Sequence, residues 1–505
     1  MKDIAIVGAG IAGLSAGIYA LQSGFNATIY ESHTTPGGAS TSWRRNGYLF
    51  EGGMHWLTGS SPETPLYRVW RELGALDDTV PVYNRDPFLV FDYQGKTAYL
   101  YRDAEKLRRH FLELSPGDAK EINRLCGDIR KFSKMSMPVT DIKGVRLKQK
   151  THMPLSMLGG IIPVMTRMPF YSGQTVREYA ARFQSPLLRL LLENIIGPDY
   201  NASGLVFTMA QFASGDGGYP EGGSLGMAAR MAKKFTSLGG TIRYGCKVER
   251  VAVRNKAACG VTVDGEQMEV DAVIVTQDTL AAIDSLLDVP IREPWAEAMR
   301  RDTQPMLDTF VGLGIEADLS DLPERLQFVP EHSFLCGGVP QRVAGICNYA
   351  AYPGYAPEGC SAVTSIIVGD SYDFWKKCRE NGTYAAEKEK LAASVIDVLE
   401  KKYPQTTGRI AVWDVATPLT YERYLGSYKG SWMTVMGKGR RPASYPQKPG
   451  SVSNLYFAGQ RLRSPGGLPV AVDSGRRAVQ YLCRDADTVF QGNGVPQRVT
   501  ISKTV

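Results

Sequence analysis

The chain has 505 residues, of which 43% are hydrophobic and 22% are charged, a composition typical of globular proteins with more than one domain. Its net charge of +7 is modest for this length, so we expect no nucleic-acid partner. Eight scattered cysteines without a C-x-x-C pair argue against a metal site and a disulfide framework, and favour a reducing, cytoplasmic location.

The first predicted element is a nucleotide-binding unit. Residues 4–20 read IAIVGAGIAGLSAGIYA, a β-branched strand followed by Gly8, Gly10 and Gly13 in a G-x-G-x-x-G pattern and then by a helix of small residues. Gly8 permits a tight turn, Gly10 lets the backbone approach a pyrophosphate, and Gly13 lets the helix pack closely on the strand. The helix N-terminus then offers free N–H groups to the phosphates.

An acidic residue completes this unit. A second apolar run, residues 27–30, leads into Glu31, which lies eighteen residues after Gly13. Its carboxylate can accept hydrogen bonds from the adenosine ribose hydroxyls, and its charge argues against a 2′-phosphate. The sequence therefore predicts that the chain binds a dinucleotide, and leaves open which one.

The middle of the chain alternates between strand and helix patterns. Glycine-rich loops at 36–41 and 50–56 precede a predicted hairpin, residues 88–93 and 97–101, and a mostly helical stretch from 104 to 212. Further strands are predicted at 241–244, 247–253, 260–263, 268–276, 307–315, 362–368 and 410–415, and a helix at 384–402. Within the run 268–276, residues 271–275 are expected to return to a central sheet.

A second strand–turn–helix unit lies near the C-terminus. Residues 454–478 read NLYFAGQRLRSPGGLPVAVDSGRRA, a strand leading into Gly459, a glycine–proline turn, and a helix beginning near Pro469. Two such units on one ligand imply an extended cofactor, because FAD has a ribityl chain and an isoalloxazine ring to hold. Amides from Leu468 to Ala471 can stabilise negative charge on the reduced flavin. An ordinary C-terminal βα unit is the alternative.

These units predict an α/β fold in which a discontinuous Rossmann-type FAD-binding domain carries an inserted α+β substrate-binding domain. We assign residues 1–82, 214–290 and 445–490 to the FAD-binding domain, 83–213 and 291–444 to the substrate-binding domain, and 491–505 to a flexible tail.

The motifs together resemble the FAD-dependent phytoene desaturase superfamily, and within it the carotenoid isomerase and retinol saturase branch. The resemblance rests on residues 8–20, Glu31, PGGAST at 36–41, FEGGMHWLTG at 50–59, YPEGGSL at 219–225, TPLTYERY at 417–424 and residues 454–478. The two terminal motifs are shared with flavin amine oxidases, whereas FEGGMHW and TPLTYERY favour the polyene branch.

The resemblance implies a role for individual residues. It places the pyrophosphate at Gly10, Ile11, Ala12 and Gly13, the ribose at Glu31, the diphosphate under Gly38, Ala39 and Ser40, the adenine at Val248, the ribityl–phosphate region at Gly459 and Gln460, the flavin pyrimidine at Leu468, Pro469 and Ala471, and the flavin beside Gly53, Met54 and His55. Ala39 stands where many relatives have arginine, and Gln460 where an acid is usual. Glutamine still accepts from a ribityl hydroxyl, so we expect FAD to bind.

The implied reaction is hydride transfer at flavin N5 to or from a long apolar isoprenoid, polyene or lipid substrate, by saturation, isomerisation or desaturation. His55 and Tyr428 are the candidate catalytic residues, although packing roles fit each of them equally. A flavin amine oxidase with Tyr424, Tyr428 and Trp432 as an aromatic cage is one alternative, and a non-catalytic prenyl-binding escort protein is another. Nothing in the sequence identifies the redox partner.

The sequence also suggests a membrane-facing segment, residues 143–168. Basic side chains at Lys143, Arg146, Lys148, Lys150 and His152 precede a Met- and Ile-rich run, which suits a peripheral protein that collects an apolar substrate from a lipid surface. A helix pair packed inside the substrate-binding domain is the alternative. We expect no membrane span, and no signal peptide because a strand begins at Ile4.

Overall fold

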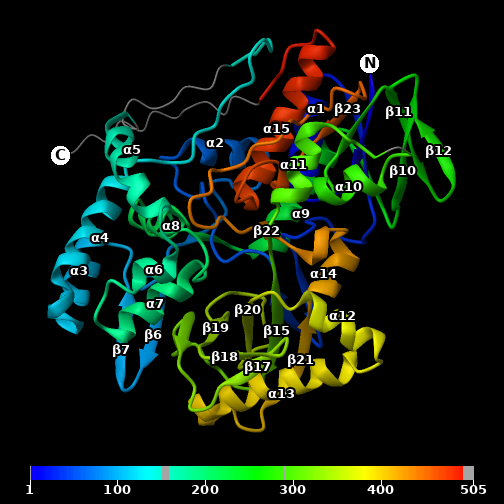
Figure 1. Cartoon of the computed structure of the whole chain (residues 1–505). Coiled ribbons are helices and arrows are strands. Elements are labelled where there is room, and N and C mark those ends of the chain that lie inside the picture. Colours follow the sequence, from blue (N-terminus) through cyan, green and yellow to red (C-terminus); the bar gives the residue numbers. More distant parts are fainter. Residues whose placement is uncertain (1, 150–157, 289, 493–505) are drawn as a thin grey trace.

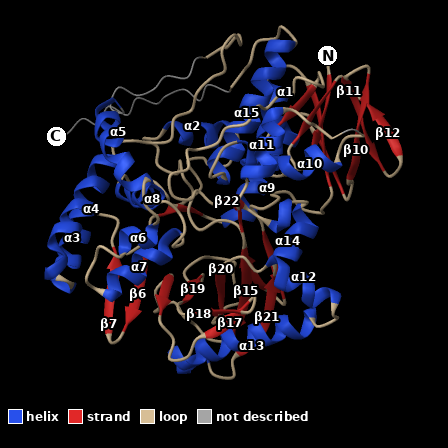
Figure 2. Ribbon diagram, viewed as in Figure 1, coloured by secondary structure: helices blue, strands red, loops and turns tan. Residues whose placement is uncertain are grey.

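The computed structural model describes residues 2–149, 158–288 and 290–492. Two β-sheets and a group of helices surround its centre (Figures 1 and 2). The sheet nearest both ends of the described chain carries the glycine-rich turn, and the larger sheet lies below it in this view, with the helices α3 to α8 beside it.

The first sheet is five-stranded and fully parallel. Its order is β23 (Leu455–Phe457), β13 (Ala272–Val275), β1 (Asp3–Val7), β2 (Asn26–Glu31) and β9 (Thr241–Tyr244). The core strands are buried on both faces, which explains the continuous apolar runs in β1 and β13. Segments far apart in the sequence thus form one nucleotide-type sheet.

Two helices pack closely at this sheet, α1 (Ile11–Gln22) and α15 (Gly467–Asp485). A Cβ at Gly13 would lie 1.9 Å from the carbonyl oxygen of Gly8, and one at Gly475 would lie 2.4 Å from that of Ala12. Glycine at these positions is therefore required by contact between backbones, as predicted for Gly13.

The second sheet has seven strands. Its order is β21 (Ile410–Ala416), β15 (Asp308–Ile315), β20 (Ser361–Val368), β19 (Ala344–Asn348), β16 (Arg325–Phe328), β6 (Leu89–Tyr93) and β7 (Lys96–Leu100), and all pairs are antiparallel except β16 with β6. The apolar face of α13 (Tyr384–Lys402), including Leu391, Val395 and Leu399, joins the hydrophobic core of this sheet.

The helical group has a hydrophobic core of its own. It comprises α3 (Ala104–Leu114), α4 (Ala119–Phe132), α5 (Leu158–Ser172), α6 (Val176–Ala180), α7 (Pro186–Ile196) and α8 (Ala202–Ala213). On α5, Ile162 and Met165 are 72% and 69% exposed. Residues 150–157 of the predicted membrane-facing segment lie outside the described residues, and no described helix is long and apolar enough to cross a membrane.

The remaining elements connect these parts. The helices are α2 (Pro65–Glu72), α9 (Gly223–Ser237), α10 (Thr279–Ser285), α11 (Pro294–Asp302), α12 (Tyr372–Glu380) and α14 (Pro418–Leu425), with short 3-10 helices η1 (Pro116–Asp118), η3 (Pro404–Thr406), η4 (Tyr428–Gly430) and η5 (Gln460–Leu462). The strands pair as β10 (Val248–Arg254) with β11 (Ala257–Val263) and β11 with β12 (Glu266–Glu269), β3 (Ser42–Arg45) with β4 (Tyr48–Glu51), β5 (Val82–Tyr83) with β8 (Tyr219–Pro220), β14 (Pro305–Met306) with β22 (Met433–Thr434), and β17 (Phe334–Cys336) with β18 (Val339–Gln341).

One strand prediction is wrong in its bounds, although the expected return of residues 271–275 to a central sheet is confirmed by β13. The run 268–276 contains the end of β12 and the whole of β13, which belong to different sheets. Between them the carboxylate of Asp271 accepts a hydrogen bond from the backbone N–H of Asp3 at 2.8 Å, and the Asp271 N–H donates to the Asp3 carbonyl. This tertiary contact lies between the two strands, and the single predicted strand 268–276 did not include a break there. The predicted domain boundaries stay predictions.

Candidate active site

One continuous cavity of about 1920 Å³ lies between the two sheets and the helical group. It begins at the carboxyl ends of the parallel strands, where Gly8 follows β1, Glu31 ends β2, Thr276 follows β13 and Gly459 follows β23. That edge is where open α/β sheets bind nucleotides. Because small-molecule sites usually measure about 300–1,000 Å³, this cavity has room for a dinucleotide and a second ligand.

Gly10 shows what the glycine-rich turn provides. Gly8 adopts a left-handed φ of +100°, which turns the backbone from β1 into α1. Gly10 is the N-cap of α1, and no side chain of the described residues caps the free amides of that helix end. A Cβ at Gly10 would meet no described protein atom closer than 3.8 Å, unlike one at Gly13. The open space beside Gly10 therefore belongs to the cavity and suits a phosphate group.

Glu31 is held by two backbone amides. Its Oε2 accepts from the N–H of Ala9 at 2.6 Å, and its Oε1 accepts from the N–H of His33 at 2.8 Å. The side chain is buried and lines the cavity. Each carboxylate oxygen has further acceptor capacity, which suits ribose hydroxyls.

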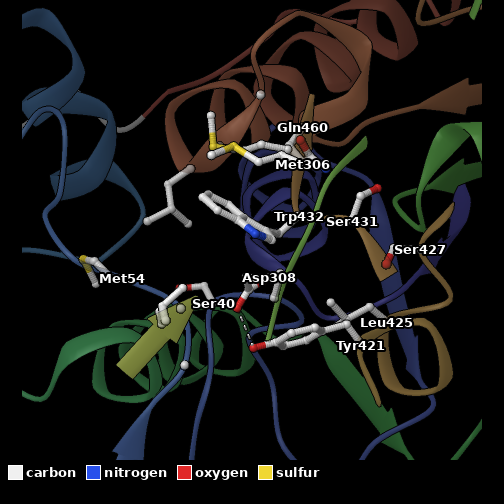
Figure 3. A pocket seen from close by; sticks show the side chains of 18 of the residues that line it. Ser40, Met54, Met306, Asp308, Tyr421, Leu425, Ser427, Ser431, Trp432 and Gln460 are labelled. Atoms are coloured by element: carbon white, nitrogen blue, oxygen red, sulfur yellow. Dashed lines mark hydrogen bonds between the residues drawn. The ribbon is translucent and has the colours of Figure 1, made fainter. Parts of the chain in front are cut away.

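The loop 36–41 closes over the same end. The N–H of Gly37 donates to the carbonyl of Ala9 at 2.9 Å, so the loop lies directly against the turn. The hydroxyl of Ser40 is buried, and no partner for it occurs among the described residues. Ser40 lines the cavity (Figure 3), which leaves its hydroxyl for a ligand.

The C-terminal unit has the same features. Gly459, with φ +143°, donates its N–H to the hydroxyl of Ser474 at 2.8 Å, and α15 begins after Gly466 without a side-chain cap. Within the described structure, the buried Oε1 of Gln460 has no hydrogen-bond partner (Figure 3). Two uncapped helix ends and two unsatisfied polar side chains thus border one cavity, and these residues fit an extended dinucleotide such as FAD.

Most of the predicted cofactor residues assemble here. The cavity is lined by Gly8, Gly10, Ile11, Ala12, Glu31, Gly38, Ala39, Ser40, Gly53, Met54, His55, Val248, Gly459, Gln460, Leu468, Pro469 and Ala471. Gly13 does not line it, because it packs beneath Gly8. The individual contacts of these residues with the cofactor stay predictions.

A buried carboxylate that the sequence reasoning missed positions the loop 50–56. Glu51 is fully buried, and its Oε1 accepts from the N–H groups of Gly53 and Met54 at 2.9 and 3.1 Å. Its Oε2 accepts from the Ser224 N–H at 2.9 Å and the Tyr219 hydroxyl at 2.8 Å. Glu51 therefore fixes the loop that brings Gly53, Met54 and His55 to the cavity. An acid directly before two glycines was the available signal.

His55 reaches the cavity, and its Nδ1 lies 3.9 Å from Sγ of Cys347. Burial, together with the positive charges of Arg325 and Arg85, lowers its pKa to about 3. The imidazole is therefore neutral at pH 7, which rules out an imidazolium proton donor there.

Tyr428 does not reach the cavity. Its side chain is 36% exposed and is not among the lining residues, and its backbone N–H donates to Asp278. Tyr424 lies against His33, with ring centroids 4.8 Å apart. Tyr424, Tyr428 and Trp432 therefore do not assemble into the aromatic cage that an amine oxidase requires.

The structure also places an unexpected carboxyl group in the cavity, that of Asp308 at the start of β15. Asp308 is 3% exposed, and its Oδ2 accepts a hydrogen bond from the Tyr421 hydroxyl at 3.3 Å, with the Trp432 indole beside them (Figure 3). Burial raises the pKa of Asp308 to about 7, against the opposing effect of the Tyr421 hydrogen bond. The residue therefore exchanges a proton near neutral pH. In the sequence it is only the polar start of an apolar run.

Comparison with known proteins identifies the class. Residues 11–483 match the family described as flavin containing amine oxidoreductase, and the chain belongs to this family. It is an FAD-dependent oxidoreductase.

Its relatives include a phytoene desaturase (lycopene-forming) from Pseudescherichia vulneris, 22% identical, which covers 96% of this chain and 100% of the relative. A prolycopene isomerase from Daucus carota is 23% identical over 96% of this chain and 80% of the relative. Among solved structures, wild-type putrescine oxidase bound to putrescine superposes with a TM-score of 0.60 at 16% identity, covering 96% of this chain and 99% of that one. That likeness shows a shared fold.

Proposed function

We propose that this FAD-dependent oxidoreductase acts on carbon–carbon single or double bonds of a long apolar isoprenoid, polyene or lipid substrate. The observation that carries the proposal is the size and continuity of the cavity, which extends from the nucleotide end to the seven-stranded sheet and the helices α7 and α8. Relatives named phytoene desaturase, 4,4′-diapolycopene oxygenase and prolycopene isomerase, each matching over almost the whole chain, support the same substrate class.

One end of the cavity binds the cofactor, and the other binds the substrate. The uncapped N-termini of α1 and α15, with Glu31, Ser40 and Gln460, hold FAD. When bound, FAD supplies hydride donation or acceptance at N5. Apolar side chains line the remaining wall, among them Leu89, Ile195, Ile196, Phe207, Val343, Ile346, Trp432 and Met433. These side chains exclude water and orient an apolar chain by shape.

Asp308 adds a proton-carrying group to this wall. Reduction of a double bond takes up a proton beside the hydride, and desaturation releases one. The carboxyl group of Asp308 holds or releases that proton at Oδ near neutral pH, and the Tyr421 hydroxyl orients it. A neutral His55 contributes shape and hydrogen bonding rather than a proton at pH 7.

The test is anaerobic incubation of the flavoprotein, oxidised or reduced, with polyene and lipid extracts, followed by flavin absorbance and product mass. A gain of two hydrogens identifies a saturase, a loss of two a desaturase, and an unchanged mass with altered double-bond geometry an isomerase. Inertness toward all polyenes together with flavin reduction by an amine would overturn the proposal in favour of an amine oxidase. Protein that cannot be loaded with FAD would favour the escort alternative.

We also propose that the protein contacts a membrane surface through residues 143–168. The exposed Ile162 and Met165, three residues apart on α5, support this contact because they share one helix face. Sedimentation with anionic vesicles tests it, and an Ile162→Ser, Met165→Ser double variant should lose binding. The cytoplasmic location stays a prediction.

A further inference from the structure

One wall of the cavity carries a cluster of polar side chains from three separate segments. Arg325 on β16 stands directly opposite Cys347 on β19 in the antiparallel register, and both line the cavity. His55, from the loop 50–56, brings its Nδ1 to 3.9 Å from the Cys347 sulfur. These three side chains face the space in which the substrate lies.

The positive charge of Arg325 has no counter-ion in this wall. Its Nη1 is buried without a hydrogen-bond partner, and over residues 2–149, 158–288 and 290–492 no carboxylate forms an ion pair with it. Its guanidinium stacks on Phe88, 4.8 Å from the ring centroid. The neighbouring Arg85 differs, because it forms an ion pair with Glu324 at 2.6 Å.

Among the titratable groups near Arg325, Cys347 and Tyr349 interact favourably with its charge, but neither of them is a carboxylate. His55 is neutral at pH 7, because burial and the charges of Arg325 and Arg85 lower its pKa to about 3. Burial also lowers the pKa of Arg325, yet a guanidinium stays protonated in proteins. An uncompensated charge away from water is costly, so the arrangement favours an incoming anion.

A second unsatisfied group lies on the same face of β16. Gln327 donates from Nε2 to the carbonyl of Asn194 at 2.9 Å, while its buried Oε1 has no partner in the described part of the chain. Arg325 and Gln327 are two residues apart, so both face the cavity. A water molecule bound beside an anion could donate to that oxygen.

We propose that Arg325 binds a carboxylate at the end of the long apolar substrate. This inference rests on the proposed function, since it concerns the same cavity, and it narrows the substrate class from apolar chains in general to apolar acids. A single uncompensated positive charge matches a monovalent carboxylate better than a phosphate dianion. With one end held, the distance from Arg325 to the flavin sets which carbon–carbon bond reacts.

Equilibrium binding tests the inference without requiring turnover. The probes are oleate, oleyl alcohol and oleyl phosphate, which share one chain, measured by calorimetry below their micelle concentrations on FAD-loaded protein. Because a charge-assisted hydrogen bond contributes roughly 1.5–3 kcal/mol, oleate should bind about tenfold or more tightly than oleyl alcohol. Arg325→Gln should abolish that preference and leave the affinity for the alcohol unchanged.

Two further variants separate charge from structure. Arg342→Gln removes the same charge from an exposed side chain outside the cavity and should keep the preference for oleate. Arg325→Lys keeps the charge and should retain part of the preference, which keeps the inference testable if Arg325→Gln does not fold.

Equal affinity of the wild type for acid and alcohol, or an equal loss of both ligands in Arg325→Gln, would overturn the inference. Tighter binding of oleyl phosphate than of oleate would overturn the assignment to a carboxylate. The proposed function fails separately, through absent FAD loading or inertness toward all polyenes, and neither outcome depends on the oleate preference.

Discussion

The two ends of the cavity differ in which protein groups line them, since backbone groups dominate at one end and side chains at the other. At the nucleotide end, the cavity is formed mainly by backbone groups at glycine-rich turns and helix termini, including those of Gly8, Gly10 and Gly459. At the substrate end, isolated side chains such as Asp308 and Arg325 emerge from an otherwise apolar wall. Damage at the nucleotide end should therefore abolish flavin binding, whereas damage at the substrate end should leave the flavin in place and change ligand or proton behaviour.

The largest loss of stability should follow from Gly13→Ala. Its Cβ would lie 1.9 Å from the Gly8 carbonyl, so the α1–β1 contact must open, at a cost of about 3 kcal/mol or more in the free energy of unfolding. Gly10→Ala should cost the flavin-free protein only about 1 kcal/mol but lose flavin, because its methyl group enters the cavity.

Urea unfolding and flavin content measure both glycine variants. Gly127→Ala, in α4 with open space around its Cβ, is the matched control and should be neutral or stabilising. Equal unfolding free energies for Gly10→Ala and Gly13→Ala would contradict the distinction between ligand space and protein packing.

Asp308→Asn should change stability in a pH-dependent way. The pKa of Asp308 rises from 3.8 in the unfolded chain to about 7 in the folded one, so the folded state binds more protons between these values. Wild-type stability therefore falls as pH rises from about 4 to 7, by up to about 4 kcal/mol, and stays low above pH 7.

The asparagine variant lacks this loss. It should be more stable than the wild type at pH 8 and equal to it near pH 4, with unchanged flavin content. A constant difference between the two unfolding free energies across this range would show that Asp308 does not titrate as described.

Glu51→Gln should lower the free energy of unfolding by about 3 kcal/mol. Both carboxylate oxygens of Glu51 accept hydrogen bonds, whereas the NH2 group of glutamine can only donate and would face one of these pairs of donors. Flavin content should fall with it, since Gly53 and Met54 lose their anchor. Glu63→Gln, at an exposed position, is the control. Retention of full flavin content in Glu51→Gln would place the loop outside the cofactor site.

His55→Gln should give the smallest effect, with the opposite sign to Asp308→Asn. The pKa of His55 falls from 6.5 to about 3 on folding, so the unfolded chain binds the extra proton between these values. Wild-type stability is complete above pH 6.5 and declines by about 2 kcal/mol by pH 5, a decline that the glutamine variant should lack. Thermal unfolding of the wild type and the variant at pH 5 and pH 7.5 would detect this decline. If the difference in stability between the two proteins were the same at both pH values, His55 would be protonated at pH 5 in the folded protein.

Local patterns predicted much of the fold because they reflect short-range physics. The apolar face of residues 384–402 predicts α13 with its observed bounds, and Gln94-Gly95 predicts the turn between β6 and β7. The return of residues 271–275 to a central sheet was predicted, but the bounds 268–276 were wrong because the run is divided between two sheets beside a contact with Asp3, which is far away in sequence.

The residues of the site likewise fall into those that local sequence predicted and those that it did not. The residues predicted at the nucleotide end line the cavity, apart from Gly13, because a turn and a helix start are encoded within a few neighbouring residues. Tyr428 was expected at the site and points elsewhere, whereas Glu51, Asp308 and Arg325 were not singled out. An acid or an arginine in a sequence is usually a solvated surface group, and nothing local marks Glu51 and Asp308 as buried or Arg325 as part of the cavity wall.

The sequence by itself determined the two glycine-rich strand–turn–helix units that line the cavity, since backbone geometry there follows from neighbouring residues. Only the tertiary structure decided which charges face the substrate. The raised pKa of Asp308 arises from burial by segments distant in the chain, and the missing counter-ion of Arg325 depends on which side chains the fold brings beside it.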